Sequence, residues 1–172
     1  MDKLKEYICG AYKQVAINFD DKKWHVKGGI PNGAGWYFIK TDAPLEVIKR
    51  QKIWAETYTL KKSGKKTRVK NYNLQERADR YSSNLSSYWN INEVYSGLAS
   101  NLMSRAKDHT FGDPGTGSLC LSRYPELKNY KWSFNYLILD DFIVKCEPPD
   151  MILHLGEQLW RAGNGWPILC AE

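Results

Sequence analysis

Hydrophobic residues along the chain form several short runs with the period of a β-strand. Residues 36–40 are apolar and aromatic and lie between turn residues, and residues 132–139 start with alternation and end apolar, so both predict strands. Shorter strands are expected at residues 14–19 and 93–96, with Gly97 closing the second. A β-sheet is therefore expected as part of the fold.

Other segments have the spacing or the end signals of helices. Ser100 is the expected N-cap of a helix at residues 101–109, and Asp150 is that of a helix at residues 150–161. The other expected helices are residues 2–11 (or a strand lead-in), 44–50 and 74–88. Loops are expected at residues 27–35 and 112–117, which are rich in glycine. Strands and helices in this order predict an α/β (α+β) domain that spans residues 1–172.

Residues 54–60 and 67–72 predict two strands around a turn at residues 62–65, that is, a hairpin. Six basic residues fall within ten positions of this hairpin: Lys61, Lys62, Lys65, Lys66, Arg68 and Lys70. The chain also holds seven Trp and eleven Tyr, and basic residues among aromatics suit a surface that meets phosphates and bases. A solvated tip with a solubilising charge run explains the hairpin equally well. The net charge of +6 permits nucleic acid binding without requiring it.

The composition is that of an ordinary soluble globular protein, with 42% hydrophobic and 26% charged residues. The length of 172 residues favours one domain with a substantial core. No apolar run approaches the roughly 18 residues of a membrane span, and residues 1–14 lack the apolar centre of a signal peptide. We therefore expect a cytoplasmic protein, in which the four scattered cysteines are reduced thiols and not a zinc site.

A few residues have the chemistry that phosphodiester hydrolysis needs: activation of a water, stabilisation of the charge on the phosphate, and neutralisation of the leaving oxygen. Arg105 and His109 are four positions apart on one predicted helix and share a face. Glu157 lies on a second predicted helix. Tyr37 and Tyr95 lie in two short strands, each near a glycine that permits close approach.

The two tyrosines lie in motifs that resemble those of a known family. Gly35-Trp36-Tyr37 and Tyr95-Ser96-Gly97 resemble the paired GIY and YIG motifs of the GIY-YIG nuclease superfamily. The likeness continues through residues 95–109, where an Asn-Leu helix start is followed by Arg105, similar to the family's catalytic Arg, with His109 one turn on. This stretch is the specific part of the resemblance.

The likeness extends to the end of the chain. Glu157, within residues 154–160, resembles the family's metal-binding Glu on a helix, and residues 165–169 are similar to its closing segment with a proline. The resemblance covers residues 35–40 and 93–169. The ordered set of Tyr, Tyr, Arg, His and Glu carries it better than any single piece.

Three departures from the family pattern stand out. Trp36 and Ser96 replace the central isoleucines of the two motifs, and Leu98 stands where a lysine is common. The gap between the motifs is also far longer than the short hairpin usual in the family. Residues 42–92 would form an insertion that is looped out, which costs little entropy. Insertions and the placement of His109 resemble restriction endonucleases within the superfamily.

The resemblance implies a small mixed or antiparallel central sheet flanked by helices, with a hairpin-containing insertion, and a metal-dependent activity on double-stranded DNA. Glu157 would bind one divalent metal ion, with Mg²⁺ expected and Mn²⁺ as the alternative. Arg105 would clamp the scissile phosphate through its planar guanidinium. Tyr37 and Tyr95 would lie around the attacking water, and one of them or His109 would act as general base.

Each of these residues also has an ordinary structural explanation. Glu157 taken alone is an exposed helical glutamate, and Arg105 taken alone forms a surface ion pair with Asp108 or Glu93. Either tyrosine taken alone is a half-buried aromatic residue of a strand. His109 taken alone caps the C-terminus of its helix.

Four functions fit the sequence. The first is a site-specific endonuclease such as a type II restriction enzyme, for which a palindromic site would require a symmetric homodimer. The second is a structure-specific or repair-type GIY-YIG nuclease. The third is a nucleic-acid-binding module that keeps the fold without catalysis, and the fourth is an ordinary α/β protein with chance matches.

Overall fold

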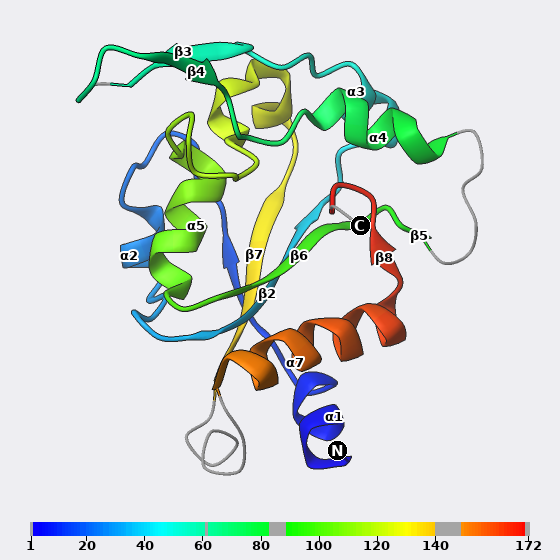
Figure 1. Cartoon of the computed structure of the whole chain (residues 1–172). Coiled ribbons are helices and arrows are strands. Elements are labelled where there is room, and N and C mark those ends of the chain that lie inside the picture. The colour runs from blue at the N-terminus through cyan, green and yellow to red at the C-terminus, as the bar shows by residue number, and fades with distance from the viewer. Residues whose placement is uncertain (1, 61, 83–88, 140–148, 171–172) are drawn as a thin grey trace.

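The computed structural model describes residues 2–60, 62–82, 89–139 and 149–170, and it is built around an antiparallel sheet (Figure 1). The strands lie in the order β1-β7-β2-β6, and each neighbouring pair is antiparallel. Their bounds are Lys13–Ala16 for β1, Gly35–Thr41 for β2, Glu93–Ala99 for β6 and Trp132–Ile138 for β7. The expected mixed α/β class with helices around a small sheet is confirmed.

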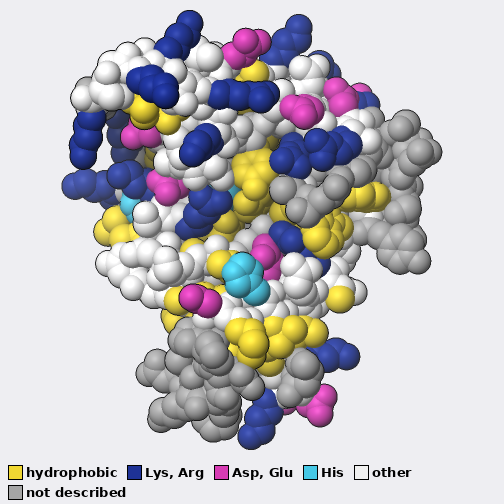
Figure 2. Space-filling model, viewed as in Figure 1, with side chains coloured by type: hydrophobic (Ala, Val, Ile, Leu, Met, Phe, Trp, Pro, Cys, Tyr) yellow, Lys and Arg dark blue, Asp and Glu magenta, His cyan; other side chains and the backbone are white. Residues whose placement is uncertain are grey.

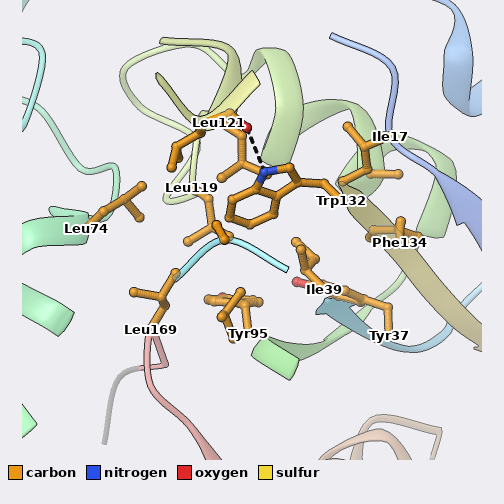
Figure 3. Packing of buried hydrophobic residues seen from close by; sticks show 14 of the residues in the cluster. Ile17, Tyr37, Ile39, Leu74, Tyr95, Leu119, Leu121, Trp132, Phe134 and Leu169 are labelled. Atoms are coloured by element: carbon orange, nitrogen blue, oxygen red, sulfur yellow. Dashed lines mark hydrogen bonds between the residues drawn. The ribbon is translucent and has the colours of Figure 1, made fainter. Parts of the chain in front are cut away.

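Alternate residues of β2 point to opposite faces of the sheet and enter two separate hydrophobic clusters. Trp36 and Phe38 pack in the smaller cluster with side chains of α1 (Asp2–Ile8) and α7 (Pro149–Asn164). Tyr37 and Ile39 belong to the larger cluster, which includes residues of α5 (Leu102–Phe111). Figure 3 shows part of this larger cluster, with the indole of Trp132 donating to the carbonyl of Leu127 at 2.9 Å. The face that holds Tyr37 is therefore the face that α5 covers.

Residues 42–92, which we call segment 42–92, contain structure of their own. Its elements are α3 (Leu45–Lys49), β3 (Thr57–Thr59), β4 (Lys66–Arg68), α4 (Leu74–Ser82) and β5 (Trp89–Asn90). Strands β3 and β4 pair around a turn in which Gly64 has a φ of +64°, which confirms the hairpin with shorter strands than predicted. Strand β5 pairs in parallel with β8 (Trp166–Pro167). The last part of the helix predicted at residues 74–88 lies outside the described residues.

Several predicted boundaries are wrong. Strand β6 continues through Gly97 to Ala99 because it pairs with β2 along that whole length. The N-cap of α5 is Asn101 instead of Ser100, since the Asn101 side chain accepts from the backbone N–H of Ser104 at 2.8 Å. Helix α7 begins at Pro149, so Asp150 lies in its first turn and is not its cap.

The first loop is also shorter than predicted, because a helix occupies part of it. Helix α2 (Trp24–Lys27) overlaps the start of the loop expected at residues 27–35.

Cys9, Cys120 and Cys170 are free thiols, as expected, and the last two are buried; Cys146 lies outside the described residues. Within the described part of the chain, no helix is both long enough and apolar enough to cross a membrane.

Gly156 lets helix α7 lie directly on the ring of Trp36. A Cβ atom at this position would overlap the indole, which cannot easily move because it is 1% exposed and donates to the carbonyl of Leu153 at 2.8 Å. We predict that Gly156→Ala lowers the free energy of unfolding by about 1–3 kcal/mol, measured by chemical denaturation. Gly163→Ala is the matched control on the same helix, because a Cβ there meets nothing within 4 Å. The control should be neutral or stabilising by about 0.5–1 kcal/mol, and equal losses in both variants would contradict the packing argument.

Candidate active site

The two tyrosine motifs lie side by side because β2 and β6 are neighbours in the sheet. Tyr37 is opposite Gly97 and Ile39 is opposite Tyr95, which places both tyrosines on one face. The rings of Tyr37 and Tyr95 stack with centroids 6.2 Å apart. A Cβ atom at Gly97 would lie 2.5 Å from the Tyr37 hydroxyl. Gly97 therefore provides the space that the phenol of Tyr37 occupies.

Helix α5 brings two further side chains to the hydroxyl of Tyr37. Arg105 and His109 are one turn apart on α5, as predicted. The Arg105 Nε–H donates to Tyr37 Oη at 3.0 Å, and His109 Nε2 lies 2.8 Å from the same oxygen. Arg105, His109 and Tyr37 thus form one hydrogen-bonded cluster.

The hydrogen bonds of His109 fix which ring nitrogen carries its proton. Its side chain is fully buried (0% exposed), and burial lowers its pKa well below the ordinary value of 6.5, so the imidazole is neutral. Nδ1 accepts from the backbone N–H of Leu119 at 3.3 Å, which leaves the proton on Nε2. Nε2–H then donates to Tyr37. The Tyr37 oxygen therefore accepts two hydrogen bonds, one of them from a cation.

Burial and charge act in opposite directions on the two phenols. Burial raises the pKa of Tyr37 above its ordinary value of 10.0, and Arg105 opposes this through its charge and its hydrogen bond. Burial also raises the pKa of Tyr95 well above 10.0, and the neighbouring Tyr37 and Tyr72 add to the effect. Both phenols are therefore neutral in the structure as it stands.

The remaining donors of Arg105 bind the loop that follows α5. Nη1 donates to the carbonyl of Thr116 at 3.2 Å, and Nη2 donates to the carbonyl of Gly117 at 3.1 Å and to Tyr95 Oη at 3.5 Å. With Nε bound to Tyr37, four of the five guanidinium N–H groups are in use. This half-buried cation therefore has no need of the ion pair with Asp108 or Glu93 considered above, and Glu93 pairs with Lys40 at 3.1 Å.

Tyr72, in segment 42–92, is a member of the cluster that the sequence did not reveal. The Tyr95 hydroxyl donates to the Tyr72 hydroxyl at 3.2 Å, and the two rings meet edge to face at 5.3 Å. The guanidinium of Arg77 lies over the Tyr72 ring at 5.2 Å. Only the fold joins Tyr72 to Tyr95, because 23 positions separate them and neither motif includes Tyr72.

Glu157 lies on α7 in an ion pair and not among the tyrosines. Its Oε1 accepts from Arg161 Nη2 at 2.6 Å, and the two side chains are 13% and 11% exposed. Arg161 also donates to Ser96 Oγ at 3.0 Å and stacks on Trp166 at 4.3 Å. Glu157 is therefore partly buried beside β6, unlike an exposed helical glutamate, and its charge contributes to the raised pKa of Tyr37.

Glu157 offers one carboxylate to a hard cation that keeps most of its water. Within the described residues, no three His, Cys, Asp or Glu side chains gather as a set of metal ligands. Mg²⁺ is commonly held by one or two carboxylates with water and phosphate oxygens, so one carboxylate suffices. Burial raises the pKa of Glu157, and the charges of Arg161 and His154 oppose this. A bound cation would add a further positive charge and so favour the ionised carboxylate.

The structure places five of the six basic residues of the hairpin on an exposed surface: Lys62, Lys65, Lys66, Arg68 and Lys70. Lys61 lies outside the described residues. Figure 2 shows Lys and Arg side chains gathered over the end of the molecule that holds β3 and β4.

Comparisons of this chain with protein-family models, with curated proteins and with solved structures find no match.

The buried neutral state of His109 makes stability depend on pH. The unfolded chain takes up a proton near pH 6.5 that the folded protein excludes, so the free energy of unfolding falls as the pH drops below about 6.5. We predict that wild type loses up to about 1.4 kcal/mol per pH unit relative to His109→Gln between pH 6.5 and 5, by urea denaturation. The raised pKa values of Asp108 and Glu157 act with the opposite sign but cancel in the difference. Parallel curves for the two proteins would show that His109 titrates normally.

Proposed function

We propose that this protein hydrolyses DNA phosphodiester bonds as a metal-dependent endonuclease organised like the GIY-YIG nucleases. One observation carries the proposal: Arg105 and His109 both donate to the oxygen of Tyr37, beside Tyr95. Four residues matched to the family from sequence motifs and their order thus meet in one cluster. Chance matches would have no reason to converge in this way, which supports the nuclease over an ordinary α/β protein.

The hydrogen bonds favour Tyr37 over His109 as the general base. His109 Nδ1 is occupied by the N–H of Leu119 and Nε2 carries the proton, so the imidazole has no free lone pair for a proton from water. The Tyr37 oxygen receives two donors, and both stabilise its phenolate more than its phenol. In the proposed reaction, Tyr37 first releases its own proton to solvent, a loss that the charge of Arg105 favours. The phenolate then accepts a proton from the attacking water, whose oxygen bonds to phosphorus as the bond to the leaving oxygen breaks, and the leaving oxygen takes up a proton from solvent.

Arg105 is proposed to hold the scissile phosphate. Its contacts with the carbonyls of Thr116 and Gly117 occupy the side of the guanidinium that a phosphate would use. A phosphate oxygen would replace one or both carbonyls and bring a negative charge to the cation. The hydrogen bond from the guanidinium to a charged phosphate oxygen is stronger than the bond to the neutral carbonyl that it replaces.

Glu157 is the residue proposed to hold the metal ion, with Mg²⁺ expected. When bound, the ion would supply positive charge that neutralises the phosphate and opposes the effect of the Glu157 charge on the pKa of Tyr37. Glu157 must share its carboxylate with Arg161, which occupies Oε1 at 2.6 Å and leaves Oε2 for the ion. Arg161 would then orient the carboxylate in the way that outer-shell partners orient metal ligands.

The exposed lysines of the hairpin are proposed to bind the DNA backbone and to give affinity that the small cluster lacks. Site-specific cleavage by a type II restriction enzyme is the function we favour, acting as a homodimer if its site is palindromic. A structure-specific or repair-type nuclease is the second candidate. A binding module without catalysis is the third, and the occupied donors of Arg105 are the observation in its favour.

The metal ligand can be tested on DNA. We predict that the purified protein cuts supercoiled plasmid and phage DNA in Mg²⁺ and not in EDTA, and that Glu157→Gln cuts at least about 100-fold more slowly. Gln is preferred to Ala because it retains a partner for Arg161. Asp150→Asn on the same helix is the control, since Asp150 is exposed, and it should cut at the wild-type rate. Discrete bands would indicate site-specific cleavage, and cutting confined to flaps or branches would indicate a structure-specific enzyme.

Failure to cut any DNA by folded wild type that binds DNA would favour the binding module. Full activity of Glu157→Gln, with unchanged dependence on Mg²⁺, would remove Glu157 from the metal site.

The identity of the general base can be tested by two substitutions at the cluster. Tyr37→Phe should lower the cleavage rate by about 10²–10⁴-fold, the usual contribution of a general base. His109→Gln should lower it by less than about tenfold, because the glutamine amide can still donate to Tyr37. Single-turnover rates at saturating DNA give the comparison. The reverse order of the two effects would make His109 the base.

A further inference from the structure

A cleft of about 740 Å³ is lined by residues of segment 42–92 and, at one side, by Gly117 of the loop that follows α5. Its lining includes Arg68 and Lys70 from the end of the hairpin, Tyr72, Arg77 from α4, and Gly117 from the loop. Backbone hydrogen bonds from Lys70 to Pro114 at 3.0 Å and from Tyr72 to Ser118 at 3.2 Å hold this part of segment 42–92 against the loop. The cleft is therefore a built feature of the fold, and its volume is in the range of ligand-binding sites.

The charges around this cleft are arranged for an anion. Among the described residues, none of Arg68, Lys70 and Arg77 has a carboxylate within ion-pair distance. The cleft also contains Glu56 and Glu76, but Glu76 is paired with Arg80 at 3.6 Å. The three cations outnumber the two carboxylates in the lining, which leaves a net positive charge that a ligand can neutralise.

The cleft leads to the candidate active site through two of its lining residues. Gly117 provides a carbonyl to Arg105 at 3.1 Å, and Tyr72 accepts from Tyr95 at 3.2 Å. Tyr72 is only partly buried, whereas Tyr95 is 6% exposed. A DNA strand that passes Arg105 would therefore continue into the cleft, with Tyr72 at the border between the candidate active site and the cleft.

We propose that this cleft binds the DNA backbone next to the scissile phosphate, with Arg68, Lys70 and Arg77 contacting phosphates and Tyr72 positioning Tyr95. The inference rests on the proposed nuclease function and names the substrate contacts of that same site. The proposed DNA contacts of segment 42–92 then lie at the cleft as well as at the exposed turn of the hairpin. Arg77 and Tyr72 are the residues that the inference adds.

The test is DNA affinity as a function of salt, measured by fluorescence anisotropy on a labelled duplex without metal. The triple variant Arg68→Gln, Lys70→Gln, Arg77→Gln is compared with a control of equal charge change: Lys5→Gln, Lys13→Gln, Lys22→Gln. The control lysines are exposed and lie outside the cleft. Each phosphate contact contributes about 0.9 to the slope of log Kd against log salt. The cleft variant should reduce the slope by about two to three and weaken binding by at least about tenfold, while the control should keep most of both.

The role of Tyr72 has its own readout. Tyr72→Phe keeps the ring and its contact with Arg77 but removes the hydroxyl that accepts from Tyr95. The Kd for DNA should stay within about twofold, and the single-turnover cleavage rate should fall by about three- to tenfold. An unchanged rate, or a loss confined to affinity, would overturn the positioning role. Thermal unfolding of each variant shows whether the fold is intact.

The outcomes separate this inference from the proposed function. Wild type that cuts DNA, with the cleft variant binding as tightly as the control, would overturn the cleft and leave the nuclease standing. Binding that depends on the cleft without any cleavage would support the cleft and overturn the nuclease. Wild type that neither binds nor cuts DNA would overturn both.

Discussion

The hydroxyl of Tyr37 is the group on which the arrangement of the site depends. It lies on a buried face of the sheet, where an unpaired polar atom costs about 1–3 kcal/mol. Arg105 and His109 satisfy it from one face of α5, and Gly97 leaves room for it on the adjacent strand. A half-buried cation, a neutral imidazole and a phenol thus share one network, in which the loss of the Tyr37 hydroxyl would leave Arg105 Nε and His109 Nε2 without their partner.

The loop after α5 completes this network from its other side. The backbone of Leu119 fixes the tautomer of His109, and the carbonyls of Thr116 and Gly117 fix the guanidinium of Arg105. Backbone groups provide these contacts, so the contacts do not depend directly on which side chains the loop carries. A chain can therefore place the same cluster with a different loop sequence, provided that the carbonyls and the N–H face α5.

Much of this could be predicted from the sequence because it depends on local spacing. The period of two in β2 places Tyr37 on the opposite face from Trp36, and four positions place Arg105 and His109 together on one helical face. Contacts between distant segments left no such signal. The bond between Tyr72 and Tyr95 depends on how segment 42–92 folds back, and the pairing that carries β6 through Gly97 outweighs the usual role of glycine as a breaker.

Segment 42–92 was expected to be looped out of the fold, and its contacts show that it is part of the site. Besides two backbone bonds to the loop after α5, the amide of Asn71 donates to the carbonyl of Ser118 at 3.3 Å and to the thiol of Cys120 at 2.9 Å. Asn71 is 6% exposed, so these bonds are shielded from water and hold the loop firmly. The loop that restrains Arg105 is thus fixed by the segment that carries the exposed basic hairpin. Under the proposed function, DNA bound at the hairpin would be connected to the guanidinium of Arg105 through the carbonyls of this loop. A chain with only a short hairpin between the two motifs would lack that connection.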